Sequence, residues 1–84
     1  MYKILIVEDD ETIAGGLKNH LEKWNYQAEC MTDFKDVMGK FVEFEPQLVL
    51  LDIVLPFFNG FHWCQEIRKI SKVPIIFLSS ANDN

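Results

Sequence analysis

The sequence has few cysteines, prolines and glycines, and each shortage excludes a class of protein. Among 84 residues there are two cysteines, three prolines and four glycines, while hydrophobic residues make up 49%. Cys30 and Cys64 are too few and too far apart for a disulfide framework or a CxxC metal site, so we expect a reducing, cytoplasmic setting. The apolar content and the few prolines and glycines exclude disordered and collagen-like chains.

Positive charge and long hydrophobic runs are also scarce. Eight basic residues against 13 acidic ones give a net charge of −5, which leaves no basic surface for nucleic acid or an anionic membrane. We therefore expect that these residues do not bind DNA by themselves. No apolar run approaches the roughly 20 residues of a membrane span, and the N-terminal run is too short for a signal sequence.

Four short apolar runs predict strands, at residues 2–7, 26–31, 48–51 and 74–78. The first, third and fourth hold consecutive apolar residues without alternation, which is typical of strands covered on both faces. The second run alternates loosely between apolar and polar residues, as an edge strand does.

Between these runs, apolar residues recur at helical spacing and predict helices near residues 11–24, 34–42 and 58–70. Gly15 and Gly16 each cost the first helix roughly 1 kcal/mol relative to alanine. The resulting βαβαβαβ order predicts right-handed crossovers and a mostly parallel sheet in one small domain. The side chains expected to face the core are Ile13, Leu17, Leu21, Trp24, Phe34, Val37, Met38, Phe41, Val42, Phe61, Cys64, Ile67 and Ile70.

Acidic and hydroxyl side chains follow the predicted strands, at the edge of an α/β sheet where ligands bind. Glu8 and Asp9 follow the first strand, Asp52 follows the third, and Ser79 follows the fourth. If the first and third strands are neighbours about 4.8 Å apart, their three carboxylates lie close together and repel one another. A hard divalent cation relieves this repulsion, and an all-oxygen site suits Mg²⁺ better than zinc.

The same arrangement suits phosphoryl transfer. A metal ion can bridge a carboxylate nucleophile and an incoming phosphoryl group, and an aspartate can form an acyl phosphate. Asp52 is the candidate nucleophile, and the Ser79 hydroxyl can donate to a phosphoryl oxygen. A simpler interpretation remains open for the first cluster, because Asp9 and Asp10 also suit the N-terminus of a helix, with Asp10 as its N-cap.

These motifs resemble the receiver domain of two-component response regulators. Residues 4–10 resemble the first strand with its acid pair, residues 48–56 with Gly60 resemble the phosphoacceptor strand with its proline and glycine, and residues 74–79 resemble the strand that ends in the switch hydroxyl. The resemblance implies a flavodoxin-like, doubly wound parallel α/β sheet. It also implies that a sensor histidine kinase phosphorylates Asp52 on a protein that is not a turnover enzyme.

The resemblance implies a set of site residues as well. Mg²⁺ would be held by Asp9, by Asp52, by the main-chain carbonyl of Val54 and, mostly through water, by Glu8. Ser79 would move toward the phosphoryl group. Residues 55–64 and 77–80 are similar to OmpR-type regulators that answer to bacitracin and cationic antimicrobial peptides. In that group a DNA-binding domain follows the receiver, which implies a role in transcription regulation.

The sequence also departs from the family pattern. The family has five strands in the order 2-1-3-4-5, whereas residues 1–84 supply four, so we expect a single partial receiver domain in the order 2-1-3-4. The lysine that follows the fifth strand in the family has no counterpart in residues 1–84. An apolar fourth strand with an open edge and uncovered faces is expected to drive self-association of this chain, either by edge pairing or by swapping of elements.

Two other functions are alternatives to phosphoacceptance. Phosphatases of the haloacid dehalogenase type need a second aspartate two residues after the nucleophile, and Val54 stands there, so this class is excluded. A receiver-like interaction module that is not phosphorylated remains the alternative, because the family lysine is missing from these residues. Binding of Mg²⁺ and a phosphoryl analogue would separate the two.

Overall fold

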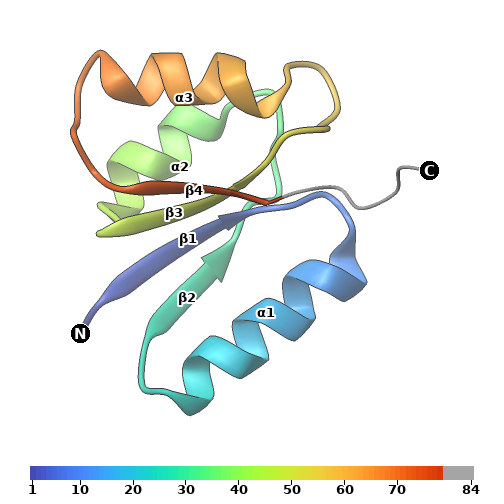
Figure 1. The fold of residues 1–84 in the computed structure, drawn as a ribbon, viewed down its shortest axis with the longest axis vertical. Helices are drawn as coiled ribbons and strands as arrows, with labels where there is room; N and C mark the ends of the chain where they lie inside the picture. The colour runs from blue at the N-terminus through green and yellow to red at the C-terminus, as the bar shows by residue number, and fades with distance from the viewer. Residues whose placement is uncertain (79–84) are drawn as a thin grey trace.

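The computed structural model describes residues 1–78 as a parallel sheet with helices on both faces (Figure 1). The sheet order is β2-β1-β3-β4, and every neighbouring pair is parallel. The elements in chain order are β1 (Lys3–Val7), α1 (Glu11–Lys23), β2 (Gln27–Cys30), α2 (Val37–Phe44), β3 (Leu48–Asp52), α3 (Gly60–Arg68) and β4 (Ile75–Leu78). The predicted α/β class and the strand order 2-1-3-4 are confirmed.

The strand register brings the carboxyl ends of the central strands to one edge. Val7 pairs with Leu51 in the β1–β3 ladder, and Asp52 pairs with Leu78 in the β3–β4 ladder. Residues that follow β1 therefore lie beside the end of β3. Ser79, the residue after β4, lies outside the described residues, so its predicted position is not tested by the structure.

The core lies on both faces of the sheet, which explains the unbroken apolar runs of the central strands. In Figure 1, α1 covers one face, and α2 and α3 cover the other. Leu5 and Val7 point into the cluster beneath α2 and α3, while Ile4 and Ile6 point into the smaller cluster beneath α1. All four side chains are almost fully buried, as the absence of alternation predicts.

Several predictions of inward-facing helix residues were wrong. Trp24 follows the last residue of α1, and Ile70 lies beyond the end of α3, so neither is held against the sheet. In α3 the inward positions are occupied by Trp63 and Ile67, one helical turn apart, which turns Phe61 outward. The predicted core residues that are instead exposed are Ile13, Trp24, Val42, Phe61 and Ile70.

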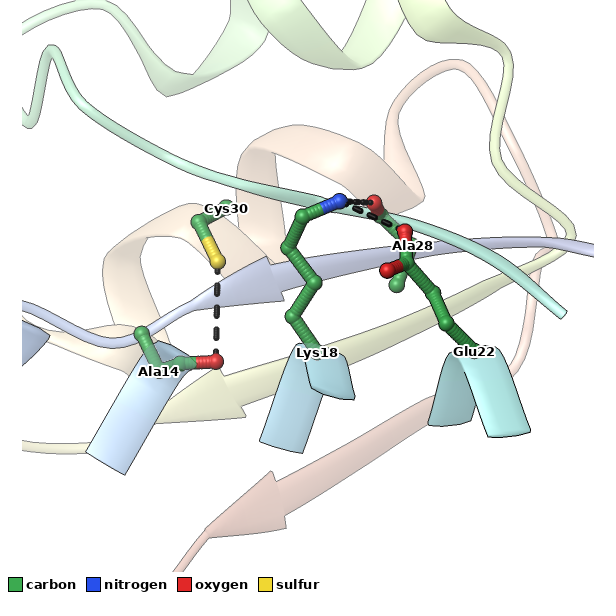
Figure 2. A network of polar contacts seen from close by, with 5 residues as sticks. All are labelled: Ala14, Lys18, Glu22, Ala28 and Cys30. Atoms are coloured by element: carbon green, nitrogen blue, oxygen red, sulfur yellow. Dashed lines mark hydrogen bonds and ion pairs between the residues drawn. The ribbon is translucent and has the colours of Figure 1, made fainter. Parts of the chain in front are cut away.

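The outer edge of β2 is covered by polar contacts from α1 (Figure 2). Lys18 donates from Nζ to the carbonyl oxygen of Ala28 at 2.9 Å and pairs with Glu22 at 2.6 Å. The thiol of Cys30 points toward the carbonyl oxygen of Ala14, 3.6 Å away, and burial raises its pKa. An edge covered by a charged side chain is poorly suited to pairing with another strand.

Candidate functional site

Three carboxylates meet where β1 and β3 end. Glu8, Asp9 and Asp52 each offer an oxygen atom, and these atoms all lie within 4.8 Å of one another. Glu8 and Asp52 are buried, with 8% and 5% of their surface exposed, whereas Asp9 is exposed. The structure therefore brings together the three acidic residues that the sequence places at these strand ends.

Burial and mutual repulsion shape the electrostatics of this cluster. The pKa of Glu8 is raised above 4.5, chiefly because burial removes the carboxyl from water and also because Asp52 and Asp9 repel its charge. The Asp10 main-chain N–H donates to Oε2 of Glu8 at 3.0 Å, which opposes part of this rise. The cluster is thus destabilised when all its carboxyls are ionised, and a cation would relieve that cost.

The donor set fits Mg²⁺. All three side chains supply oxygen, and no histidine or cysteine belongs to the cluster within residues 1–78. Mg²⁺ prefers a few carboxylates together with retained water, and the exposed Asp9 leaves one side of the cluster open to solvent. Val54 lies two residues after Asp52, and the predicted part of its carbonyl in the metal site stays a prediction.

Asp10 belongs to the helix and not to the carboxylate cluster. Its Oδ1 accepts hydrogen bonds from the main-chain N–H groups of Thr12 and Ile13, at 3.0 and 3.2 Å. This confirms Asp10 as the N-cap of α1. A cavity of about 250 Å³ lies beside the cluster, between the start of α1 and the end of β2, and Glu8, Asp9 and Cys30 contribute to its lining.

The loop after β3 holds Asp52 through main-chain contacts. The Ile53 N–H donates to Oδ1 of Asp52 at 2.9 Å, and the Gly60 N–H donates to the Ile53 carbonyl at 2.9 Å. Between them, Phe58 N–H donates to the Pro56 carbonyl at 2.8 Å across Phe57. This closes a three-residue γ-turn.

Phe57 was missed as a special residue by sequence reasoning. Its φ is 70°, a left-handed conformation that bulky residues rarely adopt. Glycine or asparagine would have indicated such a turn, whereas phenylalanine carries no such signal. In the same region, the ring of His62 stacks on Phe58 with centroids 4.4 Å apart.

Comparison with known proteins decides the family. The sequence matches the response regulator receiver domain over residues 4–84. The chain belongs to this receiver family. A transcriptional regulatory protein of Bacillus subtilis, YvcP, is 53% identical over 83 residues, which cover 99% of this chain and 35% of the relative. The sensory transduction protein BceR of Halalkalibacterium halodurans is 48% identical over 80 residues, covering 95% of this chain and 35% of that protein.

Solved receiver structures share the fold of this receiver chain. The N-terminal domain of the nisin resistance regulator NsrR superposes with a TM-score of 0.90 at 49% identity, covering 100% of this chain and 71% of that one. The regulator TrrA of Thermotoga maritima, solved with Mg²⁺ and BeF, gives a TM-score of 0.85 at 34% identity, covering 94% and 70%. TrrA has also been solved in complex with the histidine kinase ThkA. The receiver chain spans about a third of the length of the curated relatives.

Within residues 1–78, no helix of the receiver has the length and apolarity that crossing a membrane requires.

Proposed function

We propose that this receiver accepts a phosphoryl group on Asp52 from a sensor histidine kinase in a Mg²⁺-dependent reaction. The observation that carries the proposal is the meeting of Glu8, Asp9 and Asp52 at the end of two buried strands, with carboxylate oxygens within 4.8 Å. Family membership supports it, as do a relative solved with Mg²⁺ and BeF and the same relative solved with a histidine kinase.

In the proposed reaction, a carboxylate oxygen of Asp52 attacks the phosphorus atom of a phosphohistidine. The new O–P bond forms as the P–N bond breaks, and the imidazole nitrogen leaves with the electron pair. When bound, Mg²⁺ would neutralise charge on the phosphoryl oxygens. Glu8, Asp9, Asp52 and the carbonyl of Val54 are the proposed ligands, and Ser79 is proposed to bond the phosphoryl group.

The proposal extends to the protein of which such a receiver is usually a part. We infer that residues 1–84 belong to one receiver domain, and that it controls a DNA-binding output in transcription regulation in the cytoplasm. The likeness to the nisin resistance regulator, a lantibiotic response regulator, supports a response to antimicrobial peptides. The chain itself is proposed to cycle between phosphorylated and free states and not to turn over a substrate. Self-association through β4 is a further part of the proposal.

Intact mass spectrometry tests the phosphoacceptor directly. After incubation with Mg²⁺ and acetyl phosphate, the chain should gain the mass of one phosphoryl group, and omission of Mg²⁺ should abolish the gain. Asp52→Asn should remove the adduct, because an amide is a poor nucleophile. Asp33→Asn, which changes an exposed aspartate on the loop after β2, should leave the adduct unchanged.

The possible results separate the two candidate functions. An adduct that persists in Asp52→Asn would place the acceptor elsewhere. A folded wild-type chain without any adduct would favour the alternative, an interaction module that is not phosphorylated. No contact in the described residues favours that alternative over phosphoacceptance.

A further inference from the structure

Gly60, the first residue of α3, lies against the main chain at the end of β3. A Cβ atom added to Gly60 would stand 2.2 Å from the carbonyl oxygen of Asp52 and 3.1 Å from the Cα atom of Ile53. Both neighbours are main-chain atoms, so they cannot rotate away as a flexible side chain can. Any side chain at this position therefore requires the start of α3 and the end of β3 to move apart.

The usual conformational reason for a glycine does not apply here. None of the glycines, all of which lie within residues 1–78, has a positive φ. The start of α3 is already secured by Asn59, whose Oδ1 accepts a hydrogen bond from the His62 N–H at 3.0 Å. The close contact with Asp52 and Ile53 is thus the feature of this position that requires the absence of a side chain.

Two hydrogen bonds connect Gly60 to the carboxylate of Asp52. The Gly60 N–H donates to the Ile53 carbonyl, and the Ile53 N–H donates to Oδ1 of Asp52, both at 2.9 Å. Ile53 is therefore held from both sides by these bonds. A displacement of Gly60 turns Ile53, and that turn reaches both the Asp52 carboxylate and the main chain that leads to Val54.

We propose that Gly60 is a positioning residue for Asp52. By lacking a side chain, it lets α3 start against the end of β3 and fixes the direction of the carboxylate through Ile53. The inference rests on the proposed phosphoacceptor function and adds a residue that touches neither the metal nor the phosphoryl group. Residues that orient metal ligands in this way typically change metal affinity by about 10-fold to 100-fold when they are altered.

The test uses Gly60→Ala in the 84-residue chain, first without metal. The amide resonance of Ile53 should shift in a ¹H–¹⁵N spectrum, because its hydrogen bond to Asp52 is disturbed. The dissociation constant for Mg²⁺, followed by tryptophan fluorescence, should rise about 10-fold or more. The rate of labelling by acetyl phosphate at saturating Mg²⁺ should fall by a similar factor.

Two control variants separate positioning from a general loss of stability. Gly16→Ala makes the same change in α1, where an added Cβ meets nothing within 4 Å, and should leave all three readouts unchanged. Ile67→Val removes a methyl group from a fully buried residue of α3 and should lower the melting temperature. Its folded fraction should nevertheless bind Mg²⁺ and become labelled as the wild type does.

Each other result overturns one specific claim. If Gly60→Ala behaves like Ile67→Val, Gly60 is merely structural and the inference is wrong. Gly60→Ala is unfolded in a further outcome, and trimethylamine N-oxide, which favours compact states, does not restore its fold. Gly60 is then a requirement of folding, and the inference is equally wrong. If the wild type binds Mg²⁺ but is never labelled, the proposed function fails, while the Ile53 resonance and the Mg²⁺ affinity still decide the role of Gly60.

Discussion

At the scale of single residues, the buried carboxyl of Glu8 connects the acidic site to the stability of the fold. Its pKa is raised above 4.5 in the folded chain, chiefly by burial. The folded state therefore holds a proton at pH values where the unfolded chain has released it. By linkage, the free energy of unfolding should rise as pH falls from neutral through the raised pKa of Glu8, and should stop rising near 4.5.

This pH dependence can be measured by urea unfolding in metal-free buffer between about pH 7 and about pH 5. The other shifted pKa values lie outside this window, because Glu66 is lowered from 4.5 while Cys30 and Lys40 are raised from 9.0 and 10.5. Glu8→Gln should flatten the pH dependence of the free energy of unfolding and should stabilise the chain at neutral pH. Added Mg²⁺ should flatten the same pH dependence in the wild type. An unchanged slope in Glu8→Gln would assign the effect to another group.

The acidic site shows how far sequence reasoning reaches for single residues. Parallel strands end at a common edge, so the positions of Glu8, Asp9 and Asp52 in the chain were enough to predict that they meet. Their different burial was not predictable, because it depends on how α1 and the loop after β3 close over the edge. The contact between Gly60 and Asp52 was equally hidden, since it arises from the packing of a helix start on a strand end.

At the scale of elements, the loop between β3 and α3 contains a strained γ-turn at Phe57. This side chain has a φ of 70° and is 65% exposed, and its ring lies 4.9 Å from Nζ of Lys35. Left-handed backbone is unfavourable for a residue with a Cβ atom and is readily adopted by glycine. Phe57→Gly should therefore be more stable than Phe57→Ala by about 1 kcal/mol, although both lose the ring.

Urea unfolding of the two variants measures this difference, with Gly16 as the reference position. In α1 the order of stability should reverse, so that Gly16→Ala is more stable than the wild type. Alanine is favoured over glycine by about 1 kcal/mol in a helix interior, and Gly16 has open space around it. The same order at both positions would show that the turn at Phe57 stores no strain.

Capping residues set where the helices start, and the sequence identified one of them, Asp10, in advance. The side chain of Asp36 accepts a hydrogen bond from the Gly39 N–H at 3.0 Å. The helix α2 therefore begins at Val37, three positions after Phe34, where the predicted apolar stripe begins. Asn59 sets the start of α3 in the same way. The inward faces were less predictable, because Val42 and Phe61 are apolar residues on outward positions, and hydrophobicity alone does not distinguish the two sides of such a helix.

At the scale of the whole molecule, the two outer edges of the sheet differ in how they are covered. Lys18 reaches the Ala28 carbonyl at the edge of β2 (Figure 2). Lys40 pairs with Glu29 on the same strand. Within residues 1–78, β4 pairs on one side with β3, and its other edge has no strand partner and no ion pair. Uncovered apolar edges promote pairing between chains.

We therefore expect two copies of the 84-residue chain to associate through antiparallel pairing of β4 about a two-fold axis. Ile76 and Phe77 are 51% and 37% exposed and carry no charge, so pairing would place them beside apolar side chains of the neighbouring strand without repulsion. The antiparallel arrangement places the two acidic sites at opposite ends of the paired strands, which limits repulsion between chains that each carry a net charge of −5.

Sedimentation equilibrium over a range of concentrations tests this association. The wild type should form dimers, and Ile76→Lys should shift the equilibrium to monomers, because it places a charge on the open strand. Val42→Lys is the matched control, since Val42 is 59% exposed on α2, which contributes nothing to the open edge. A monomeric wild type at all concentrations would contradict pairing through β4, and dimers lost equally in Val42→Lys would place the interface on another surface.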